Sequence, residues 1–204
     1  AEIADVKAAL VRRVVDRTPL AYIMGLAWLG GQCFAVSEHT LIPRSYFVEL
    51  IQGEPGLGVW LGKREPKRIL ELCTGSGCLA ILLAQRYPEA RVSATDISND
   101  ALDVAEHNIL QHGLADRVEL RQGDLYGAIG DERFDLIVAN PPYEPSALCD
   151  DLSPELQHEP RLALDGGADG MDLVRRIVNE ARAHLTPQGV LAIEVPVGRP
   201  DLLE

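Results

Sequence analysis

Short apolar runs alternate with amphipathic segments in the part of the chain that follows Lys67. Runs rich in Val, Ile and Leu are typical of buried strands, and apolar residues three or four apart are typical of helices. The expected strands lie near residues 68–72, 91–95, 117–121, 134–139 and 189–195, and the expected helices near 78–86, 99–111 and 170–184. Ser98 or Asn99 is expected to cap the second helix, and Asp169 the third. This alternation predicts an α/β fold, in which helices cover both faces of a parallel sheet.

The N-terminal residues follow a helical pattern of their own. Apolar side chains recur three or four apart over residues 3–15, at Ile3, Val6, Leu10 and Val14. This spacing predicts an amphipathic helix. We expect its apolar stripe to pack in a core rather than to serve as a docking surface.

A hairpin and a connector are expected next. Two short apolar runs between Trp28 and Ile42 flank Gly30-Gly31, which predicts a β-hairpin with a tight turn. Residues 53–66 contain four glycines and two prolines, a composition typical of a connector. We therefore divide the chain into an N-terminal helix-and-hairpin segment (1–52), a linker (53–66) and a main domain (67–204).

Composition narrows the class of protein. With 204 residues, 47% of them hydrophobic, the chain can bury one sizeable core plus a small appendage. The formal net charge of −12 disfavours stable nucleic-acid binding and suits a basic partner. The four cysteines show no C-x-x-C spacing and no pairing with histidines, so we expect no metal site and a reducing compartment. No apolar run approaches the length of a membrane span, so we expect a cytoplasmic protein with no membrane partner.

A glycine-rich loop follows the first strand of the main domain. Strand 68–72 leads into Cys73-Thr74-Gly75-Ser76-Gly77 and then into a helix. The loop therefore lies at the carboxyl end of a strand, where open α/β sheets bind ligands. Asp96 ends the next strand, nineteen residues after Gly77, where its carboxylate can accept hydrogen bonds from both hydroxyls of a ribose. Residues 75–80 also satisfy G-x-G-x-x-A, so a dinucleotide is an alternative ligand, and a simple strand-to-helix turn is the structural alternative.

Polar residues are expected at the ends of four strands: Glu71, Asp96, Asp124 and Asn140. In this row we expect Asp124 to bind the amino group of an adenine. The row suits a ligand that carries a ribose, an adenine and a cationic centre, and S-adenosyl-L-methionine has all three. A dinucleotide would instead require a phosphate-binding helix N-terminus.

The strand expected at 134–139 ends in Asn140-Pro141-Pro142-Tyr143. Proline lacks an N–H and biases the preceding residue toward extended backbone, so we expect the carbonyl groups of this loop to point outward without sheet partners. The Asn140 side-chain oxygen and the Pro141 carbonyl can each accept one hydrogen of an amino or amide group, and Tyr143 can cover its face. With both hydrogens held, the nitrogen can pyramidalise and aim its lone pair at a methyl donor. The loop thus predicts N-methylation without a side-chain base, and a strand-terminating turn is the alternative interpretation.

Taken together, these motifs resemble the class I methyltransferases that modify glutamine side-chain amides of translation proteins. The similarity covers nearly the whole chain and rests on Leu41-Ile42-Pro43-Arg44, Glu71 to Gly77, Asp96-Ile97-Ser98, Asn140 to Tyr143, His158-Glu159-Pro160, Ala163-Leu164 and Asp169-Gly170. Ala27-Trp28 and Glu155 to Pro160 resemble the branch that acts on large-subunit ribosomal protein L-three more than the branch that acts on peptide-release factors. The resemblance implies a Rossmann-like fold and a basic ribosomal protein as substrate.

The resemblance also implies a cofactor and residue roles. The cofactor would be S-adenosyl-L-methionine, with S-adenosyl-L-homocysteine as the product. Together with the row of polar strand ends, the resemblance implies a cofactor site made of Glu71, Cys73, Thr74, Gly75, Ser76, Gly77, Asp96, Ile97, Asp124, Leu125 and Asn140. The catalytic residues would be Asn140, Pro141 and Tyr143, and the substrate glutamine would be held by Asn140, Pro141, Pro142 and Tyr143. Residues 1–52 would then recognise the substrate.

The sequence departs from the family pattern in two ways. Leu156 stands where the ribosomal-protein branch usually has tyrosine. The chain ends at Glu204, just after the fifth expected strand, where relatives continue into a hairpin, and most of their helical N-terminal domain is missing, so we expect a fragment of a longer protein.

A nucleic-acid amino-group methyltransferase and a nicotinamide-dependent oxidoreductase stay open as alternatives. His158 is expected to pack in a loop rather than to act as a base, and Cys73 and Cys78 lack an activating base. The target glutamine and the oligomeric state do not follow from the sequence.

Overall fold

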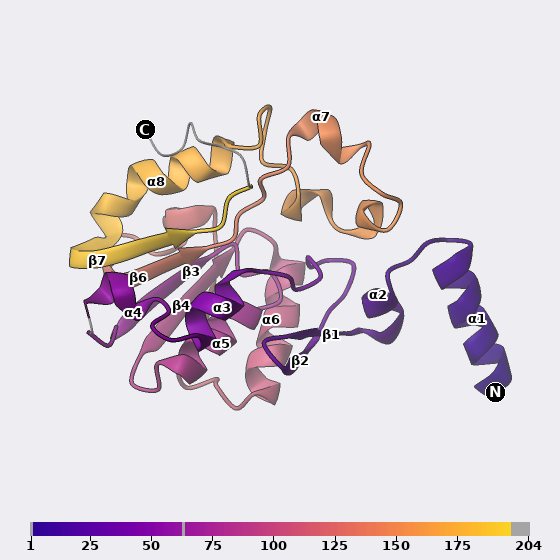
Figure 1. Cartoon of the computed structure of the whole chain (residues 1–204), viewed down its shortest axis with the longest axis horizontal. Coiled ribbons are helices and arrows are strands. Elements are labelled where there is room, and N and C mark those ends of the chain that lie inside the picture. Colours follow the sequence, from indigo (N-terminus) through magenta and orange to yellow (C-terminus); the bar gives the residue numbers. More distant parts are fainter. Residues whose placement is uncertain (1, 63, 197–204) are drawn as a thin grey trace.

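The computed structural model describes residues 2–62 and 64–196 and contains one five-stranded sheet (Figure 1). Its strands are β3 (Arg68–Leu72), β4 (Arg91–Asp96), β5 (Val118–Gln122), β6 (Phe134–Ala139) and β7 (Leu185–Ile193). They lie in the order β5-β4-β3-β6-β7, and every neighbouring pair is parallel. The predicted parallel α/β fold is confirmed. The strand order reverses between β3 and β6, which is the position at which open α/β sheets bind ligands.

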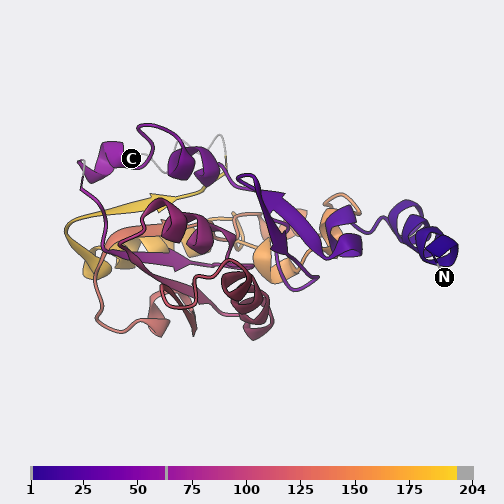
Figure 2. The ribbon, with the colours of Figure 1, turned by 90° about the horizontal axis from the view of Figure 1, so that it is seen from below.

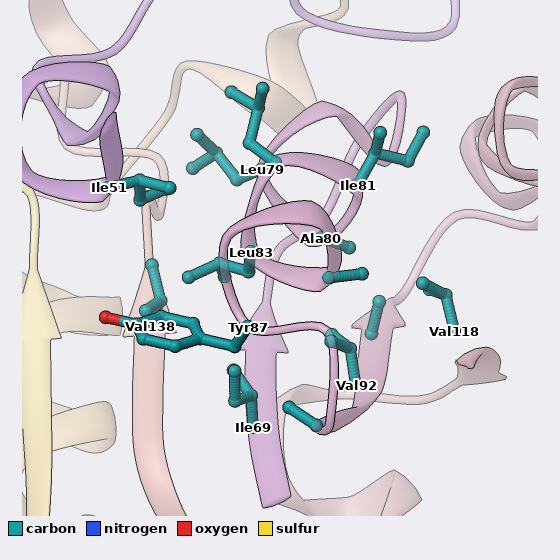
Figure 3. Packing of buried hydrophobic residues seen from close by; sticks show 14 of the residues in the cluster. Ile51, Ile69, Leu79, Ala80, Ile81, Leu83, Tyr87, Val92, Val118 and Val138 are labelled. Atoms are coloured by element: carbon teal, nitrogen blue, oxygen red, sulfur yellow. The ribbon is translucent and has the colours of Figure 1, made fainter. Parts of the chain in front are cut away.

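Helices cover both faces of this sheet, as predicted. One face carries α5 (Cys78–Arg86) and α6 (Asn99–Gln111), and the other carries α8 (Asp172–His184) and the short 3₁₀ helix η1 (Leu125–Ala128). Successive residues of β3 therefore point into different cores: Ile69 packs on the α5 side, and Leu70 on the side of α8. Figure 3 shows the first of these cores, in which Leu83 of α5 lies above Ile69. Because both faces are buried, the central strands β3 and β6 are mainly apolar in sequence.

The N-terminal part includes the predicted hairpin. β1 (Leu26–Leu29) and β2 (Gln32–Ala35) pair antiparallel, and Leu29 lies opposite Gln32 across the Gly30-Gly31 turn. Two short helices follow, α3 (Phe47–Gln52) and α4 (Gly58–Leu61). Their buried side chains join the core on the α5 side, together with Leu57 from the stretch predicted as a connector. This stretch is therefore packed against the sheet layer.

Asn108 of α6 ties the hairpin to the glycine-rich loop. Its side chain is fully buried. The Oδ1 atom accepts a hydrogen bond from the Ala35 N–H at 2.7 Å, and Nδ2 donates to the carbonyl oxygens of Ala35 at 3.0 Å and Ser76 at 2.8 Å. A single amide thus satisfies backbone groups of two segments that are far apart in sequence.

The first helix, α1 (Glu2–Val14), has its predicted extent but not its predicted packing. The apolar stripe is exposed to solvent: 74% for Ile3, 59% for Val6, 56% for Leu10 and 68% for Val14. The expectation that this stripe lies in a core is therefore wrong for the part of the chain that the structure describes. Figures 1 and 2 both show α1 at one end of the molecule, away from the sheet, next to α2 (Leu20–Met24), which itself has no buried residue. The spacing predicted the helix but could not supply a partner for its apolar face.

The largest differences between predicted and observed element ends are at α8 and β7. Ser98 is the N-cap of α6 and its hydroxyl accepts a hydrogen bond from the Ala101 N–H, as predicted. The N-cap of α8 is Met171, so the prediction of Asp169 is wrong: Asp169 lies two residues before the N-cap, and its carboxylate accepts a hydrogen bond from the Met171 N–H, which precedes the helix. β7 begins at residue 185 rather than 189.

A long connection links β6 to α8 and carries three short helices. These are α7 (Ser146–Cys149) and the 3₁₀ helices η2 (Leu156–His158) and η3 (Arg161–Ala163). None of the helices in the described ranges 2–62 and 64–196 has both the length and the apolar character needed to cross a membrane.

Candidate active site

A cavity of about 430 Å³ opens where β3, β4, β5 and β6 reach their carboxyl ends. Its wall is built from the loops that follow these strands, from residues of the segment 39–45, from residues of the segment 160–163, and from Leu173 and Arg176 of α8. Because the site lies at the reversal of strand order, the topology alone brings loops from four strands together.

The glycine-rich loop lines the cavity. Its backbone adopts a conformation that residues with side chains rarely adopt. Gly75 has φ +55°, and a Cβ at this position would meet no heavy atom within 4 Å. Since Gly75 also lines the cavity, a side chain here would project into open space that a ligand can occupy. Cys73 and Leu125, which also line the cavity, adopt left-handed backbone conformations although they are not glycines. Strained residues of this kind concentrate at functional sites.

Asp96, at the end of β4, is held by the same loop. Its Oδ2 accepts a hydrogen bond from the Gly75 N–H at 2.8 Å, and its Oδ1 accepts from the Ser98 N–H at 3.0 Å. Burial raises the pKa of Asp96, and these backbone donors oppose that rise. A carboxylate has about four acceptor positions. The Asp96 carboxylate is therefore fixed in orientation while it keeps acceptor capacity toward the cavity that it lines.

Glu71 lines the same cavity although only 1% of its surface is exposed. The Thr74 hydroxyl donates a hydrogen bond to its Oε2. Burial raises the pKa of Glu71 to about 8, against the opposing effect of this hydrogen bond. In the ligand-free protein the carboxyl is therefore largely protonated at neutral pH, and a cation bound beside it would favour its ionised form.

The loop after β5 and helix α8 meet at the wall of the cavity. Asp124 lines the cavity, and its Oδ2 accepts a hydrogen bond from Arg176 Nη2 at 2.8 Å. The sequence interpretation selected Asp124 for an adenine amino group and missed its partner on α8. Arg176 lies 52 residues further along the chain, and no local pattern marks it.

The Asn-Pro-Pro-Tyr loop follows β6 directly. Asn140 and Pro142 line the cavity, and among the described residues nothing is hydrogen-bonded to the Asn140 side chain. Pro141 is buried and Tyr143 is half-buried, and neither lines the cavity. Burial raises the pKa of the Tyr143 hydroxyl. The loop thus presents the Asn140 side-chain amide, which has no hydrogen-bond partner among the described residues, to the cavity that Gly75 and Asp96 also line.

Most residues selected from the sequence meet at this cavity. Its lining includes Glu71, Cys73, Thr74, Gly75, Ser76, Asp96, Ile97, Asp124, Leu125, Asn140 and Pro142. Gly77 does not line it, and a Cβ there would lie 3.1 Å from the Ala105 side chain, so this glycine serves the contact between α5 and α6. His158 does not line it either, and its Nε2 lies 2.8 Å from the Asp16 carbonyl oxygen, which agrees with a packing role.

Two wall segments were missed as site residues. Leu41, Pro43 and Arg44 line the cavity on one side, and Pro160 and Ala163 line it further on. Both segments belong to motifs that carry the family resemblance, and this resemblance could have identified them as part of the site. Within the described residues, no group of three or more His, Cys, Asp or Glu side chains is arranged to hold a metal ion.

Comparison with known proteins identifies the family. Residues 57–156 match the family model described as "Methyltransferase small domain". A ribosomal protein uL3 glutamine methyltransferase from Bordetella pertussis is 50% identical over 187 residues, which cover 90% of this chain and 61% of the relative. A protein of the same name from Neisseria gonorrhoeae is 44% identical over 205 residues, which cover all of this chain and 67% of the relative.

Solved structures agree on the fold. A methyltransferase from Pyrococcus furiosus matches with a TM-score of 0.54 at 18% identity, covering 98% of this chain and 82% of that protein. The chain spans about three fifths of the length of the first curated relatives that it matches, 61% of one and 60% of another. The fold is the Rossmann-like class I methyltransferase fold, and the relatives favour a methyltransferase over the oxidoreductase alternative. By its sequence similarity over its whole length, this chain belongs to the family of ribosomal protein uL3 glutamine methyltransferases.

Proposed function

We propose that this chain transfers a methyl group from S-adenosyl-L-methionine to the side-chain amide nitrogen of a glutamine in ribosomal protein uL3. The names of the relatives at 44–50% identity support this substrate. The observation that carries the reaction type is that Asn140, with its unengaged side-chain amide, lines the same cavity as Gly75 and Asp96.

The cavity suits the proposed cofactor in shape and in donor set. Gly75 leaves open space where a Cβ would project, Asp96 offers acceptors for two ribose hydroxyls, and Asp124 offers an acceptor for an adenine amino group. Glu71 and Asp96 supply the negative charge that a cationic centre requires. When bound, the cofactor supplies an electrophilic methyl group on a sulfonium.

The chain's own residues would prepare the amide. An amide nitrogen is a weak nucleophile because its lone pair is delocalised into the carbonyl. In our proposal the Asn140 Oδ1 and the Pro141 carbonyl oxygen each accept one of its N–H groups, and Tyr143 packs against the amide. The nitrogen can then pyramidalise and direct its lone pair at the methyl carbon. The proton of the methylated nitrogen passes to water or a nearby acceptor, so the scheme needs no side-chain base.

The charge of the chain supports a basic partner. Its formal net charge is −12, and ribosomal proteins are generally basic because they bind RNA. Complementary fields raise the rate at which such partners meet. We propose that free uL3, or an early assembly intermediate, is the form that is methylated, since RNA on a finished subunit would repel this acidic chain.

Methyl transfer from labelled S-adenosyl-L-methionine tests the proposal. Isolated uL3, intact large subunits and a peptide-release factor are offered separately under identical conditions, and the modified residue is mapped by mass spectrometry. We expect label on a glutamine of isolated uL3 and slower labelling of intact subunits. Faster labelling of the release factor would overturn the uL3 assignment, and label confined to RNA would overturn glutamine methylation.

A further inference from the structure

A buried carboxylate joins the two wall segments of the cavity that lie around residues 41–44 and 160–163. The side chain of Glu159 is 2% exposed. Its Oε1 accepts a hydrogen bond from Arg44 Nη1 at 2.6 Å, and its Oε2 accepts from the Ile42 N–H at 3.2 Å. These bonds connect segments that are 115 and 117 residues apart in sequence. A buried carboxylate is stable only with such partners, so the contact fixes both segments together.

The segment that contains Glu159 is also connected to the Asn-Pro-Pro-Tyr loop. Residue 159 leads directly into η3, and the end of that turn pairs with the loop through two backbone bonds: Glu144 N–H to the Leu164 carbonyl oxygen, and Gly166 N–H to the Glu144 carbonyl oxygen, both at 2.8 Å. On the other side, the Thr40 carbonyl oxygen accepts a hydrogen bond from the Tyr22 hydroxyl at 2.6 Å. A displacement at Glu159 would therefore shift the wall relative to Asn140.

Two residues of these wall segments reach solvent. Leu162 lines the cavity and is 57% exposed, and the Arg44 side chain lines it and is 48% exposed. The cofactor is proposed at the glycine-rich loop and the ends of β4 and β5, which are different segments of the same cavity lining. A half-exposed rim of one apolar and one cationic side chain, on the same cavity as Asn140, suits the polypeptide that carries the target side chain.

We infer that Glu159 is a positioning residue for the polypeptide substrate: by holding Ile42 and Arg44 against the turn at 160–163, it shapes the entrance through which the glutamine side chain reaches Asn140. This inference rests on the proposed function. In the present structure the Ile42 N–H and the Arg44 guanidinium bind different oxygens of Glu159; in glutamine one of these two positions becomes an NH2 group, so one of the two donors would face a donor instead of an acceptor.

The test compares Glu159→Gln with a matched control, Asp135→Asn. Asp135 also holds backbone N–H groups of a distant segment, those of Lys67 at 2.9 Å and Arg68 at 3.1 Å, but it does not line the cavity. For each protein we would measure KM and kcat with uL3, the affinity for S-adenosyl-L-homocysteine by calorimetry, and thermal unfolding. We expect Glu159→Gln to raise KM for uL3 at least tenfold, to change kcat less than threefold, and to leave the affinity for S-adenosyl-L-homocysteine within twofold. Asp135→Asn should lower stability without changing KM.

Substitutions at Arg44 give a second route if Glu159→Gln folds poorly. Arg44→Lys keeps a cation beside Glu159 and should retain a lower KM than Arg44→Met. An unchanged KM in Glu159→Gln, or a parallel loss of affinity for S-adenosyl-L-homocysteine, would overturn the inference. A wild-type protein that methylates no glutamine of uL3 would instead overturn the proposed function, and the inference with it.

Discussion

Replacing Glu71 by glutamine tests the electrostatics of the cavity, because the substitution keeps the shape of the protonated side chain and removes its ionisable proton. The folded protein holds this proton up to a pKa of about 8, whereas the ordinary value is 4.5. Between these two values the folded state binds more protons than the unfolded chain, so the free energy of unfolding falls as pH rises. A difference of about 3.5 in pKa, at about 1.4 kcal/mol for each unit, limits this loss to at most about 5 kcal/mol.

The assay is urea unfolding of the ligand-free protein, followed by far-ultraviolet circular dichroism at several pH values from 5 to 8.5. The free energy of unfolding of Glu71→Gln minus that of the wild type should grow by about 3–5 kcal/mol over this range. Glu132→Gln is the control, because its hydrogen bond with Arg121 lowers the pKa of Glu132, and its contribution is lost only in acid, below the range tested. A difference for Glu71→Gln that stays constant across the range would show that Glu71 is already ionised, and would refute the reasoning.

Four further predictions concern the site and its support. Asn140→Ala should lower kcat by about 10²–10³ in steady-state assays while the fold survives, and near-normal turnover would contradict the proposed geometry. Asp96→Ala should weaken binding of S-adenosyl-L-homocysteine by about 1–3 kcal/mol in calorimetry; an unchanged affinity would remove Asp96 from the site. Asn108→Ala should reduce the free energy of unfolding in urea by about 1–3 kcal/mol, because it leaves buried backbone groups of Ala35 and Ser76 without their partner. Methylation of isolated uL3 should slow as salt rises past physiological strength, where the screening length is about 8 Å, and a rate that is independent of salt would exclude electrostatic steering.

The sheet and the glycine-rich loop could be predicted from the sequence because their signals are local. Each strand contains Val, Ile, Leu or Ala and is bounded by turn residues, and the expected positions of the first four agree with the structure to within one residue at each end. The polar residues at the strand ends meet at one cavity because parallel strands bring their carboxyl ends to one edge.

Features that depend on distant partners could not be predicted. The start of β7 contains Pro187, and its pairing with β6 shifts register between Phe134 and Leu136. A Cβ on Gly189 would lie 2.7 Å from the Phe134 carbonyl oxygen, so this irregular pairing depends on a close backbone approach that periodicity does not report. The ion pair between Glu159 and Arg44 has the same character, since nothing within either segment indicates the other.

The three hydrogen bonds of Asn108 limit how this chain can be divided or recombined. Two of them go to Ala35 in the hairpin and one goes to Ser76 in the glycine-rich loop. A chimera joined between residues 36 and 66 would import a hairpin that has not been fitted to this amide, whereas one joined before residue 26 would keep the hairpin, α6 and the loop from a single parent. The hairpin and the sheet domain should therefore be inherited together, and breakpoints in gene shuffling that separate them should be recovered less often among folded products than breakpoints that precede both.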